Sequence, residues 1–304
     1  MKKKIAIITP VLNEEDSIRI YLERVSDIIY KKNNYDFNIL FINNCSTDKT
    51  LEKIIELKKN YTFQINIITF TRNFGYQASL MCGLKKLNAD AYFILDADLE
   101  DPPEMLNTFI KFWEEGYKHV YGIRNVREGN ILINILRNIF YKIMSGVADF
   151  NFIPFMAEFS LIDLELRNYL IKNNTAYPLI RENIGYANLK KRGCQYIRQQ
   201  RKFGKSNYNF FGILQYAITA FLSSSTFLLR INSYLTVIFF IFNFIALFLY
   251  YTKIIDINLQ VLILINFNII LFLMGGFSLY LARLYKQSLK KPLYIIDKTK
   301  TYLI

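Results

Sequence analysis

The chain has 304 residues, of which 52% are apolar and 16% aromatic, and this composition excludes an intrinsically disordered protein. Its formal net charge of +13 favours an anionic partner, which can be nucleic acid, a lipid headgroup or a phosphorylated substrate. The three cysteines fall in no metal-ligand spacing and cannot all pair, which predicts a reducing compartment. Residues 1–230 mix charged and apolar side chains, whereas residues 234–282 are nearly uncharged, so we expect a soluble domain followed by a membrane anchor.

Short apolar runs alternate with amphipathic segments along the first 125 residues. Four of these runs predict buried strands, at residues 5–9, 37–42, 65–70 and 91–95. Residues 14–30 and 49–59 place their apolar side chains at helical spacing, and a further helix is expected from Pro103 to Trp113. The alternation predicts an α/β fold with a mainly parallel sheet.

Polar residues follow each of the four predicted strands. Asp96 and Asp98 come directly after the fourth strand, and two carboxylates one residue apart can share a divalent cation such as Mg²⁺ or Mn²⁺. The other three strands are followed by Asn13 and Glu14, by Asn44, and by Arg72. Because the carboxyl ends of parallel strands meet at one edge of a sheet, these groups are expected to share a crevice. A cation and an arginine there suit the diphosphate of a nucleotide sugar.

Two long apolar segments near the end of the chain predict membrane spans. Residues 234–251 and 259–282 contain no charged side chain and approach or exceed the roughly 20 residues that cross a bilayer. The short connection between them predicts a hairpin. Basic residues are frequent after residue 282 and sparse in the connection, so the positive-inside rule places both termini and the sheet domain in the cytoplasm.

Two other apolar segments have helical spacing but do not suit a span. Residues 209–230 are interrupted by Ser223–Ser225 and end at Arg230, which predicts a helix lying at the membrane surface. Residues 131–146 fit an interfacial helix and an ordinary core helix equally well. The chain is thus divided into a sheet domain (1–208), a juxtamembrane helix (209–230), a two-helix region (231–282) and a basic tail (283–304).

At this point the chain resembles a known family, the membrane-anchored, family-2-type glycosyltransferases that load a sugar onto a polyprenyl phosphate. Dolichol-phosphate mannose synthases and bactoprenol glucosyltransferases belong to it. The resemblance covers nearly the whole chain, including the hairpin. The motifs that carry it are Pro10–Glu15, Asn43–Asp48, Arg72–Gly75, Asp96–Glu104, Gly122–Arg124 and Arg201–Ser206.

The resemblance implies a GT-A (Rossmann-like) sheet domain in an enzyme of the bacterial cytoplasmic membrane. It implies that Asp96 and Asp98 bind the metal, with Asp98, Glu158 and Arg124 as catalytic residues. The nucleotide-sugar-binding residues are then Pro10, Asn13, Glu14, Asn44, Arg72, Asp96 and Ala97. The residues expected to hold the acceptor phosphate are Arg201, Lys205, Ser206 and Arg137.

A basic stretch from Lys190 to Lys205 contains seven basic residues and no acidic one. It precedes the membrane segments, so we favour binding of the acceptor phosphate and of anionic lipid over a merely solvated surface. Nucleic acid is not expected, because no recognised nucleic-acid-binding motif occurs in the chain.

Two departures from the family bear on the mechanism. Relatives carry Gly-Asp-Phe-Arg where this chain has Ala157-Glu158-Phe159-Ser160. A phosphate monoester is largely ionised at neutral pH, so no general base is strictly required, and we expect Glu158 to orient the acceptor or a metal-bound water. Asn44 replaces a carboxylate near the base, and its amide complements uracil better than guanine, which favours UDP over GDP.

The sequence therefore predicts an inverting, metal-dependent transfer of a hexose-type sugar from a UDP-sugar to a polyprenyl phosphate at the cytoplasmic membrane face. A degenerate nucleotide-sugar-binding protein is one alternative, suggested by Asn44, Glu158 and Ser160. A processive polysaccharide synthase is another, although two spans form no evident channel and no Gln-x-x-Arg-Trp motif occurs. A homotetramer is expected only by analogy with similar enzymes.

Overall fold

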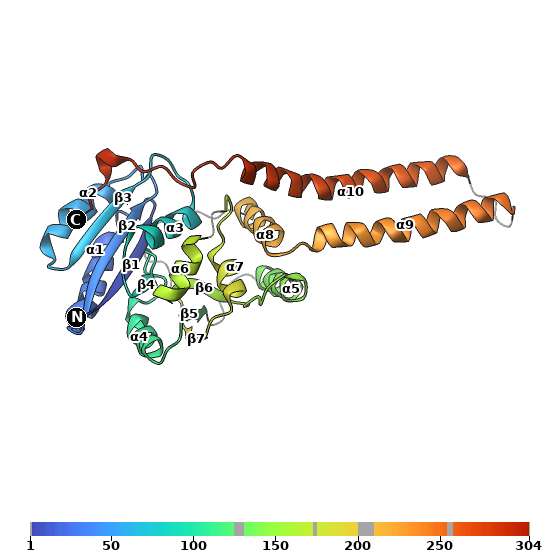
Figure 1. Cartoon of the computed structure of the whole chain (residues 1–304). Coiled ribbons are helices and arrows are strands. Elements are labelled where there is room, and N and C mark those ends of the chain that lie inside the picture. The colour runs from blue at the N-terminus through green and yellow to red at the C-terminus, as the bar shows by residue number, and fades with distance from the viewer. Residues whose placement is uncertain (1, 125–130, 173–174, 200–209, 254–257, 304) are drawn as a thin grey trace.

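The computed structural model describes residues 2–124, 131–172, 175–199, 210–253 and 258–303. In this part of the chain seven strands form one sheet with the order β3-β2-β1-β4-β6-β5-β7 (Figure 1). The strands are β1 (Lys3–Val11), β2 (Tyr35–Asn43), β3 (Gln64–Thr69), β4 (Ala91–Ile94), β5 (His119–Arg124), β6 (Met156–Asp163) and β7 (Lys191–Tyr196). The α/β fold with a mainly parallel sheet is confirmed.

Six of these strands run in one direction, and β6 alone runs against them. The strands β1 to β4 pair in parallel, β6 pairs antiparallel with both β4 and β5, and β7 is parallel to β5. The carboxyl ends of the six strands therefore lie at the same edge of the sheet as the amino end of β6. We call this edge the carboxyl edge and the opposite one the amino edge.

Helices cover both faces of the sheet. They are α1 (Ile18–Tyr30), α2 (Thr50–Leu57), α3 (Tyr76–Lys86), α4 (Leu106–Glu114), α6 (Leu164–Lys172) and α7 (Ile180–Ala187). Alternate residues of a strand face opposite sides, so Ile5 and Ile7 pack with α1, α2 and α4, whereas Ala6 and Ile8 pack with α3, α6 and α7. These two apolar layers hold the strand ends in fixed relative positions.

Helix α1 begins four residues later than the apolar spacing predicts. The backbone N–H groups of Glu14 and Glu15 donate to Thr50 Oγ1 (2.9 Å) and Asp48 Oδ2 (3.1 Å) instead of entering the helix. The carbonyl of Glu14 then closes a turn by accepting from Ser17 (3.1 Å). The loop after β1 is thus bound to the loop after β2.

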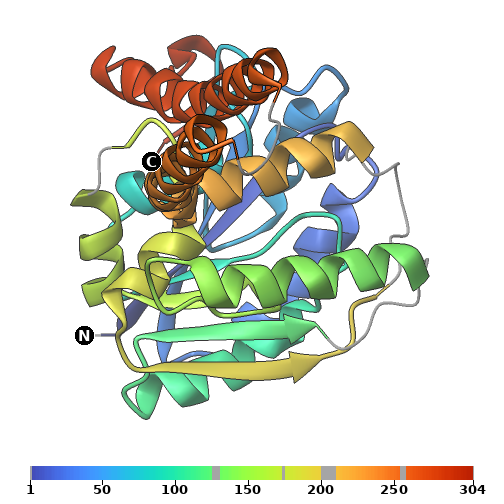
Figure 2. The same cartoon turned by 90° about the vertical axis from the view of Figure 1, so that its right-hand side faces the viewer.

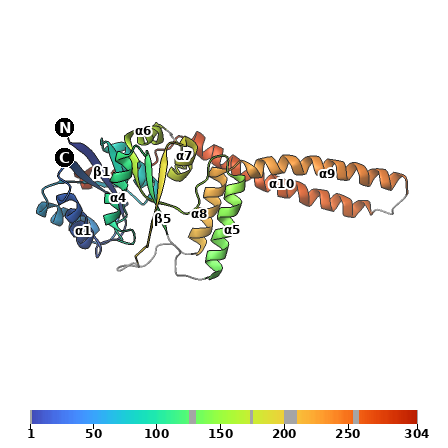
Figure 3. The same cartoon turned by 90° about the horizontal axis from the view of Figure 1, so that it is seen from below.

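Two long helices project from the sheet domain as a hairpin (Figures 1 and 3). They are α9 (Phe227–Tyr251) and α10 (Leu259–Ser288), and both are long and apolar enough to cross a membrane. Their amides pair between the helices, since Asn243 Nδ2 lies 2.7 Å from Asn266 Oδ1 and the reciprocal distance is also 2.7 Å. Both helices extend beyond the predicted spans toward the sheet domain. The predicted two-helix hairpin is therefore confirmed.

Two more helices lie at the junction between the sheet domain and the hairpin, α5 (Ile131–Val147) and α8 (Phe210–Ser224) (Figure 2). Helix α5 exposes about half of each apolar side chain in a stripe formed by Ile135, Leu136, Ile139 and Ile143. The chain just after α5 is fastened to the start of α9, because Asp149 accepts from the Thr226 N–H (2.7 Å) and pairs with Arg230 (2.8 Å). An exposed apolar stripe contradicts the core-helix interpretation of this segment.

Candidate active site

The four strand ends that carry predicted site residues meet at the carboxyl edge. Asn44 N–H donates to the Val11 carbonyl (2.9 Å), Phe70 N–H to that of Asn43 (2.9 Å), and Leu95 N–H to that of Ile8 (3.1 Å). These bonds continue the sheet ladder beyond the strands. They place the residues after β1, β2, β3 and β4 side by side, as the strand pattern predicts.

Asn13 joins the loops that follow β1 and β2. It adopts a positive φ of 58°, its N–H donates to Ser46 Oγ (3.1 Å), and its Oδ1 accepts from the Thr47 N–H (2.8 Å). Neighbouring Glu14 accepts from the Ser17 hydroxyl at Oε2 (3.1 Å). The two loops therefore form one wall of the site, and Asn13 and Glu14 are structural parts of that wall.

Asn44 is 5% exposed, and both polar atoms of its side-chain amide form hydrogen bonds within the protein. Its Oδ1 accepts from the Phe74 N–H (2.9 Å), and its Nδ2 donates to Asn73 Oδ1 (2.9 Å), which also accepts from the Gly75 N–H (2.8 Å). Asn44 thus positions the segment 71–75, which we call the donor loop. These contacts give no support to direct reading of a base by Asn44.

Arg72 lies on the donor loop and is exposed. Its guanidinium carbon lies 4.3 Å from the centre of the Phe74 ring, a cation–π arrangement that holds the charge near the loop. The side chain is therefore available at the carboxyl edge for an anionic group.

Asp96 and Asp98 follow β4, as predicted, and each has a defined partner. Tyr76 donates its hydroxyl hydrogen to Asp96 Oδ1 (2.8 Å), and Asp98 Oδ1 accepts from the Glu100 N–H (3.1 Å). Burial and the nearby charges of Asp98 and Asp101 raise the pKa of Asp96 to about 8. Concentrated negative charge of this kind is what a divalent cation neutralises.

The acidic pair suits Mg²⁺ or Mn²⁺ bound together with a ligand. Among the residues that the structure describes, no group of three or more His, Cys, Asp and Glu side chains is arranged to hold a metal. Mg²⁺ in enzymes commonly binds one or two carboxylates together with water and substrate phosphates. Asp96 and Asp98 match that incomplete donor set.

Arg124, at the end of β5, is anchored by a buried acid. Its Nη2 pairs with Asp101 Oδ2 (3.2 Å) and its Nε donates to Tyr196 (3.0 Å), whose hydroxyl donates to Asp101 Oδ1 (2.5 Å). Burial opposes the charge, but Asp101 and Tyr196 outweigh it and raise the pKa of Arg124. Tyr196 reaches this point across Gly122, where a Cβ would lie 2.5 Å from its ring. Arg124 thus stays cationic at the carboxyl edge.

Asp101 is a site residue whose role the sequence did not reveal. It is 2% exposed and also pairs with Arg198 Nε (3.5 Å), which in turn pairs with Glu100. Its place within the acidic motif was visible in the sequence, but its function as an anchor for two arginines depends on β5 and β7.

Glu158 reaches the carboxyl edge because β6 runs antiparallel to its neighbours. Its Oε1 accepts from Gln77 Nε2 (3.1 Å) and lies 3.0 Å from Arg181 Nε. Gln77 also fixes the start of α7, since its Oε1 accepts from the Ile180 N–H (3.2 Å). Gln77 and Arg181 were not among the predicted site residues, and no sequence pattern marks either of them.

The predicted acceptor-phosphate residues fall mostly beyond the described ranges. Arg201, Lys205 and Ser206 lie outside the described residues, and Arg137 is placed only by the backbone of α5. The basic stretch from Lys190 to Lys205 begins at the amino edge, where Lys191 and Arg192 pair with β5. Its first residues are therefore remote from Asp96, whereas Arg198 reaches the carboxyl edge.

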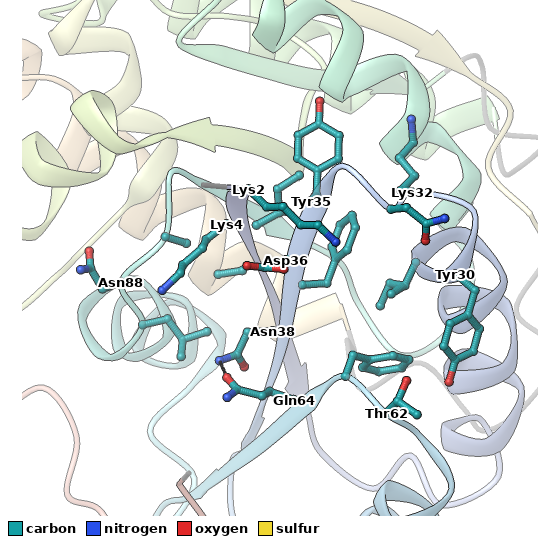
Figure 4. A pocket seen from close by; sticks show the side chains of 18 residues that line it. Lys2, Lys4, Tyr30, Lys32, Tyr35, Asp36, Asn38, Thr62, Gln64 and Asn88 are labelled. Atoms are coloured by element: carbon teal, nitrogen blue, oxygen red, sulfur yellow. Dashed lines mark hydrogen bonds between the residues drawn. The ribbon is translucent and has the colours of Figure 1, made fainter.

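A groove at the amino edge is not this site. It is lined by side chains from the first residues of β1, β2 and β3, with Lys4, Tyr35, Asp36, Asn38 and Gln64 around it (Figure 4). The predicted site residues lie at the other ends of the same strands.

Comparison with known proteins identifies the family of this chain. The profile of glycosyl transferase family 2 matches residues 6–168, just over half of the chain. An uncharacterized glycosyltransferase, YkcC of Bacillus subtilis, is 29% identical over 97% of this chain and 93% of its own length. The prophage bactoprenol glucosyl transferase homolog of Escherichia coli is 28% identical over 98% of this chain and 99% of its own length.

Solved structures with a similar sheet domain include glucosyl-3-phosphoglycerate synthase of Mycobacterium tuberculosis, crystallised with Mn²⁺, UDP and glucosyl-3-phosphoglycerate. It covers 67% of this chain and 73% of its own, with 15% identity and a TM-score of 0.47. The expected resemblance and the GT-A fold class are confirmed by the family match. The chain therefore belongs to glycosyl transferase family 2 and is a glycosyltransferase that acts on a nucleotide sugar.

Proposed function

We propose that this enzyme transfers a hexose-type sugar from a UDP-sugar to a polyprenyl phosphate, with inversion at the anomeric carbon. One observation carries the proposal: a carboxyl edge with the Asp96–Asp98 pair lies in the same chain as a two-helix apolar hairpin. The bactoprenol glucosyl transferase homolog supports it, because that similarity covers 98% of the chain and so includes the hairpin.

Donor binding is assigned to the donor loop and the acidic pair. Asp96 and Asp98 would hold Mg²⁺ or Mn²⁺, which offsets the charge of the diphosphate and stabilises it as a leaving group. Tyr76 holds Asp96 in place through its hydroxyl hydrogen bond. Arg72 and Arg124 add two cations at the same edge, so the site binds a dianionic group without relying on the metal alone.

Acceptor binding is assigned to the side where Glu158 and Arg181 meet. The base of the membrane hairpin reaches this side, because the guanidinium carbon of Arg283 in α10 lies 4.6 Å from the Tyr177 ring, four residues before Arg181. The Arg181 side chain is 33% exposed, so a phosphate arriving from the membrane can contact it. Relatives carry an arginine where this chain has Ser160, and we infer that Arg181 supplies a cation for the acceptor phosphate.

The reaction then needs little proton transfer. An oxygen of the ionised acceptor phosphate forms a bond to the anomeric carbon, while the bond from that carbon to the nucleoside diphosphate breaks. The diphosphate leaves with the electron pair. Glu158 orients the acceptor through its pairing with Gln77 and Arg181, and catalysis rests on positioning and electrostatics.

The proposed membrane arrangement is supported by the apolar hairpin and by the distribution of basic residues around it. Helices α9 and α10 cross the cytoplasmic membrane, with the sheet domain and both termini in the cytoplasm. The apolar stripe of α5 lies in the interface beside the spans, since Asp149 ties the end of α5 to the start of α9. The catalytic edge is thereby held close to a lipid-borne acceptor.

Transfer to lipid is the direct test. Purified full-length protein is incubated with undecaprenyl phosphate, Mg²⁺ or Mn²⁺, and radiolabelled UDP-glucose, UDP-N-acetylglucosamine or GDP-mannose in parallel. We expect label in the organic phase with one UDP-sugar, and loss of that label with EDTA. Nucleotide binding without transfer from any donor favours the binding-protein alternative, and a labelled polymer favours the processive synthase.

A further inference from the structure

The chain returns from the membrane hairpin to the sheet domain. After α10 ends at Ser288, residues 289–303 run back along the domain to the edge strand β3 (Figure 1). There Tyr302 and Ile67 exchange two backbone hydrogen bonds of 2.8 Å each, and Asp297 N–H donates to the Thr69 carbonyl (2.8 Å). The tail thus covers a strand edge that would otherwise offer unpaired backbone groups.

The first part of the tail makes a different kind of contact. The ring of Tyr294 stacks on Phe70, with centroids 5.1 Å apart and planes 13° apart. Phe70 in turn meets Phe74 edge-on at 5.8 Å, and Phe74 carries the Arg72 guanidinium at 4.3 Å. A continuous series of ring contacts therefore joins the tail to the donor loop.

The donor loop is held from two sides. Asn44 bonds to Asn73 and to the Phe74 N–H on the inner side, and on the outer side the Thr71 N–H donates to the Ile295 carbonyl (3.0 Å). The loop leads directly into Tyr76, which bonds to Asp96. A shift of the loop would move both Arg72 and the Tyr76–Asp96 pair.

We propose that Tyr294 is a positioning residue for the donor site. By stacking on Phe70 it fixes Phe74, and through Phe74 and the loop backbone it sets the positions of Arg72 and Tyr76. The tail is also the continuation of α10, so the segment that leaves the membrane directly supports the donor loop. This inference rests on the proposed function, since it assigns the donor diphosphate to this loop.

Edge covering alone predicts a different pattern of mutant effects. Tyr302 lies at the far end of the tail, pairs with Ile67 through its backbone and is 40% exposed. Its side chain therefore contributes to the edge but not to the donor loop. Replacing Tyr302 and Tyr294 in the same way separates the two roles.

The experiment compares four full-length variants in detergent: Tyr294→Ala, Tyr294→Leu, Tyr294→Phe and Tyr302→Ala. Affinity for UDP with Mn²⁺ is measured by calorimetry, KM is measured separately for the donor and for undecaprenyl phosphate, and thermal unfolding is monitored for each. Tyr294→Leu keeps apolar volume in the core and serves where Tyr294→Ala unfolds.

We expect Tyr294→Ala and Tyr294→Leu to weaken UDP binding and raise the donor KM by about three- to tenfold. This is the fold-change that corresponds to the free energy of one aromatic pair. The acceptor KM stays within about twofold. Tyr294→Phe retains the stacked ring and loses only the hydrogen bond between the Tyr294 hydroxyl and Cys82 of α3, so its donor KM should stay within about twofold of the wild type. Tyr302→Ala should behave as the wild type.

Unchanged donor affinity in Tyr294→Leu would overturn the inference, as would an equal loss in Tyr302→Ala or equal shifts in both KM values. Wild-type protein that binds no nucleotide would remove the proposed function and this inference together. Wild-type binding with an unaffected Tyr294→Leu removes only the inference.

Discussion

The guanidinium Nε of Arg181 lies 3.0 Å from a carboxylate oxygen of Glu158, and the two residues come from a helix and a strand that meet only in the folded protein. An acid at this point can act as a general base or as an orienting group. The contacts of this carboxylate favour the second role, because its Oε1 is already held by two partners, Gln77 Nε2 and Arg181 Nε.

Glu158→Gln is therefore expected to remain active. The amide can still accept from Gln77 and orient the acceptor, and the acceptor phosphate does not need to lose a proton at neutral pH. We expect kcat to fall by no more than about tenfold, the effect of one weakened polar contact. Steady-state transfer to undecaprenyl phosphate measures this. A loss of about four orders of magnitude in kcat with unchanged substrate binding would instead identify Glu158 as the base.

Arg181→Gln is expected to act on the acceptor. Removing a charge-assisted contact to phosphate costs about 1.5–3 kcal/mol, so kcat/KM for the polyprenyl phosphate should fall by roughly 10- to 150-fold. Affinity for UDP should stay the same, because we assign Arg181 to the acceptor and not to the donor. The matched control is Arg192→Gln, whose guanidinium lies over Phe112 at the amino edge. Equal losses in both variants would refute a specific acceptor role.

The sequence predicted the part of the site that strands β1 to β4 supply, but not the part that depends on the later strands. The strands β1 to β4 are continuous apolar runs buried on both faces, so their carboxyl ends and the polar residues that follow were recognisable. Strands β5, β6 and β7 were not among the four predicted strands, and β7 mixes Lys, Arg and Gly with few apolar residues. The meeting of Glu158 with Gln77 and Arg181 depends on β6 running antiparallel, which no local pattern encodes.

Asn44 illustrates a second limit of the sequence. Its position after a strand indicated a site residue, and the structure does place it at the carboxyl edge. Its amide contacts Asn73 and the Phe74 backbone, however, which are about thirty residues away in the chain. Residue type and position could predict that Asn44 matters for the site. They could not distinguish a group that binds the ligand from one that holds the loop.

The proposed metal site can be tested with two variants, one that removes a metal ligand and one that removes only the hydrogen bond between Tyr76 and Asp96. Asp96→Asn removes a carboxylate from the proposed metal pair and should reduce kcat by about a thousandfold or more, since metal stabilisation contributes several kcal/mol. Tyr76→Phe keeps both carboxylates and removes only the hydrogen bond that positions Asp96. It should reduce kcat by about tenfold, which corresponds to one hydrogen bond to a charged group. Mn²⁺ titrations of activity measure both effects.

A control for the tyrosine exists in the same protein. Tyr35 donates its hydroxyl hydrogen to Glu114, away from the carboxyl edge, so Tyr35→Phe removes an equivalent bond without touching Asp96. Its activity should match the wild type at every Mn²⁺ concentration. Wild-type Mn²⁺ dependence in Asp96→Asn would contradict the metal assignment.

The apolar stripe of α5 provides a test of membrane docking that is independent of the hairpin. Ile139 is 49% exposed in the middle of this stripe, and Ile139→Lys places a charge where we expect the interface. Because the hairpin still anchors the protein, we expect normal membrane insertion but a several-fold higher KM for undecaprenyl phosphate in liposomes. A short, water-soluble prenyl phosphate does not depend on docking, so Ile139→Lys and the wild type should have the same KM for it. Tyr30→Lys is the matched control, since Tyr30 is also 49% exposed but lies on α1, far along the sheet domain from the hairpin. If Ile139→Lys has the wild-type KM for undecaprenyl phosphate as well as for the short acceptor, α5 does not hold the catalytic edge to the bilayer.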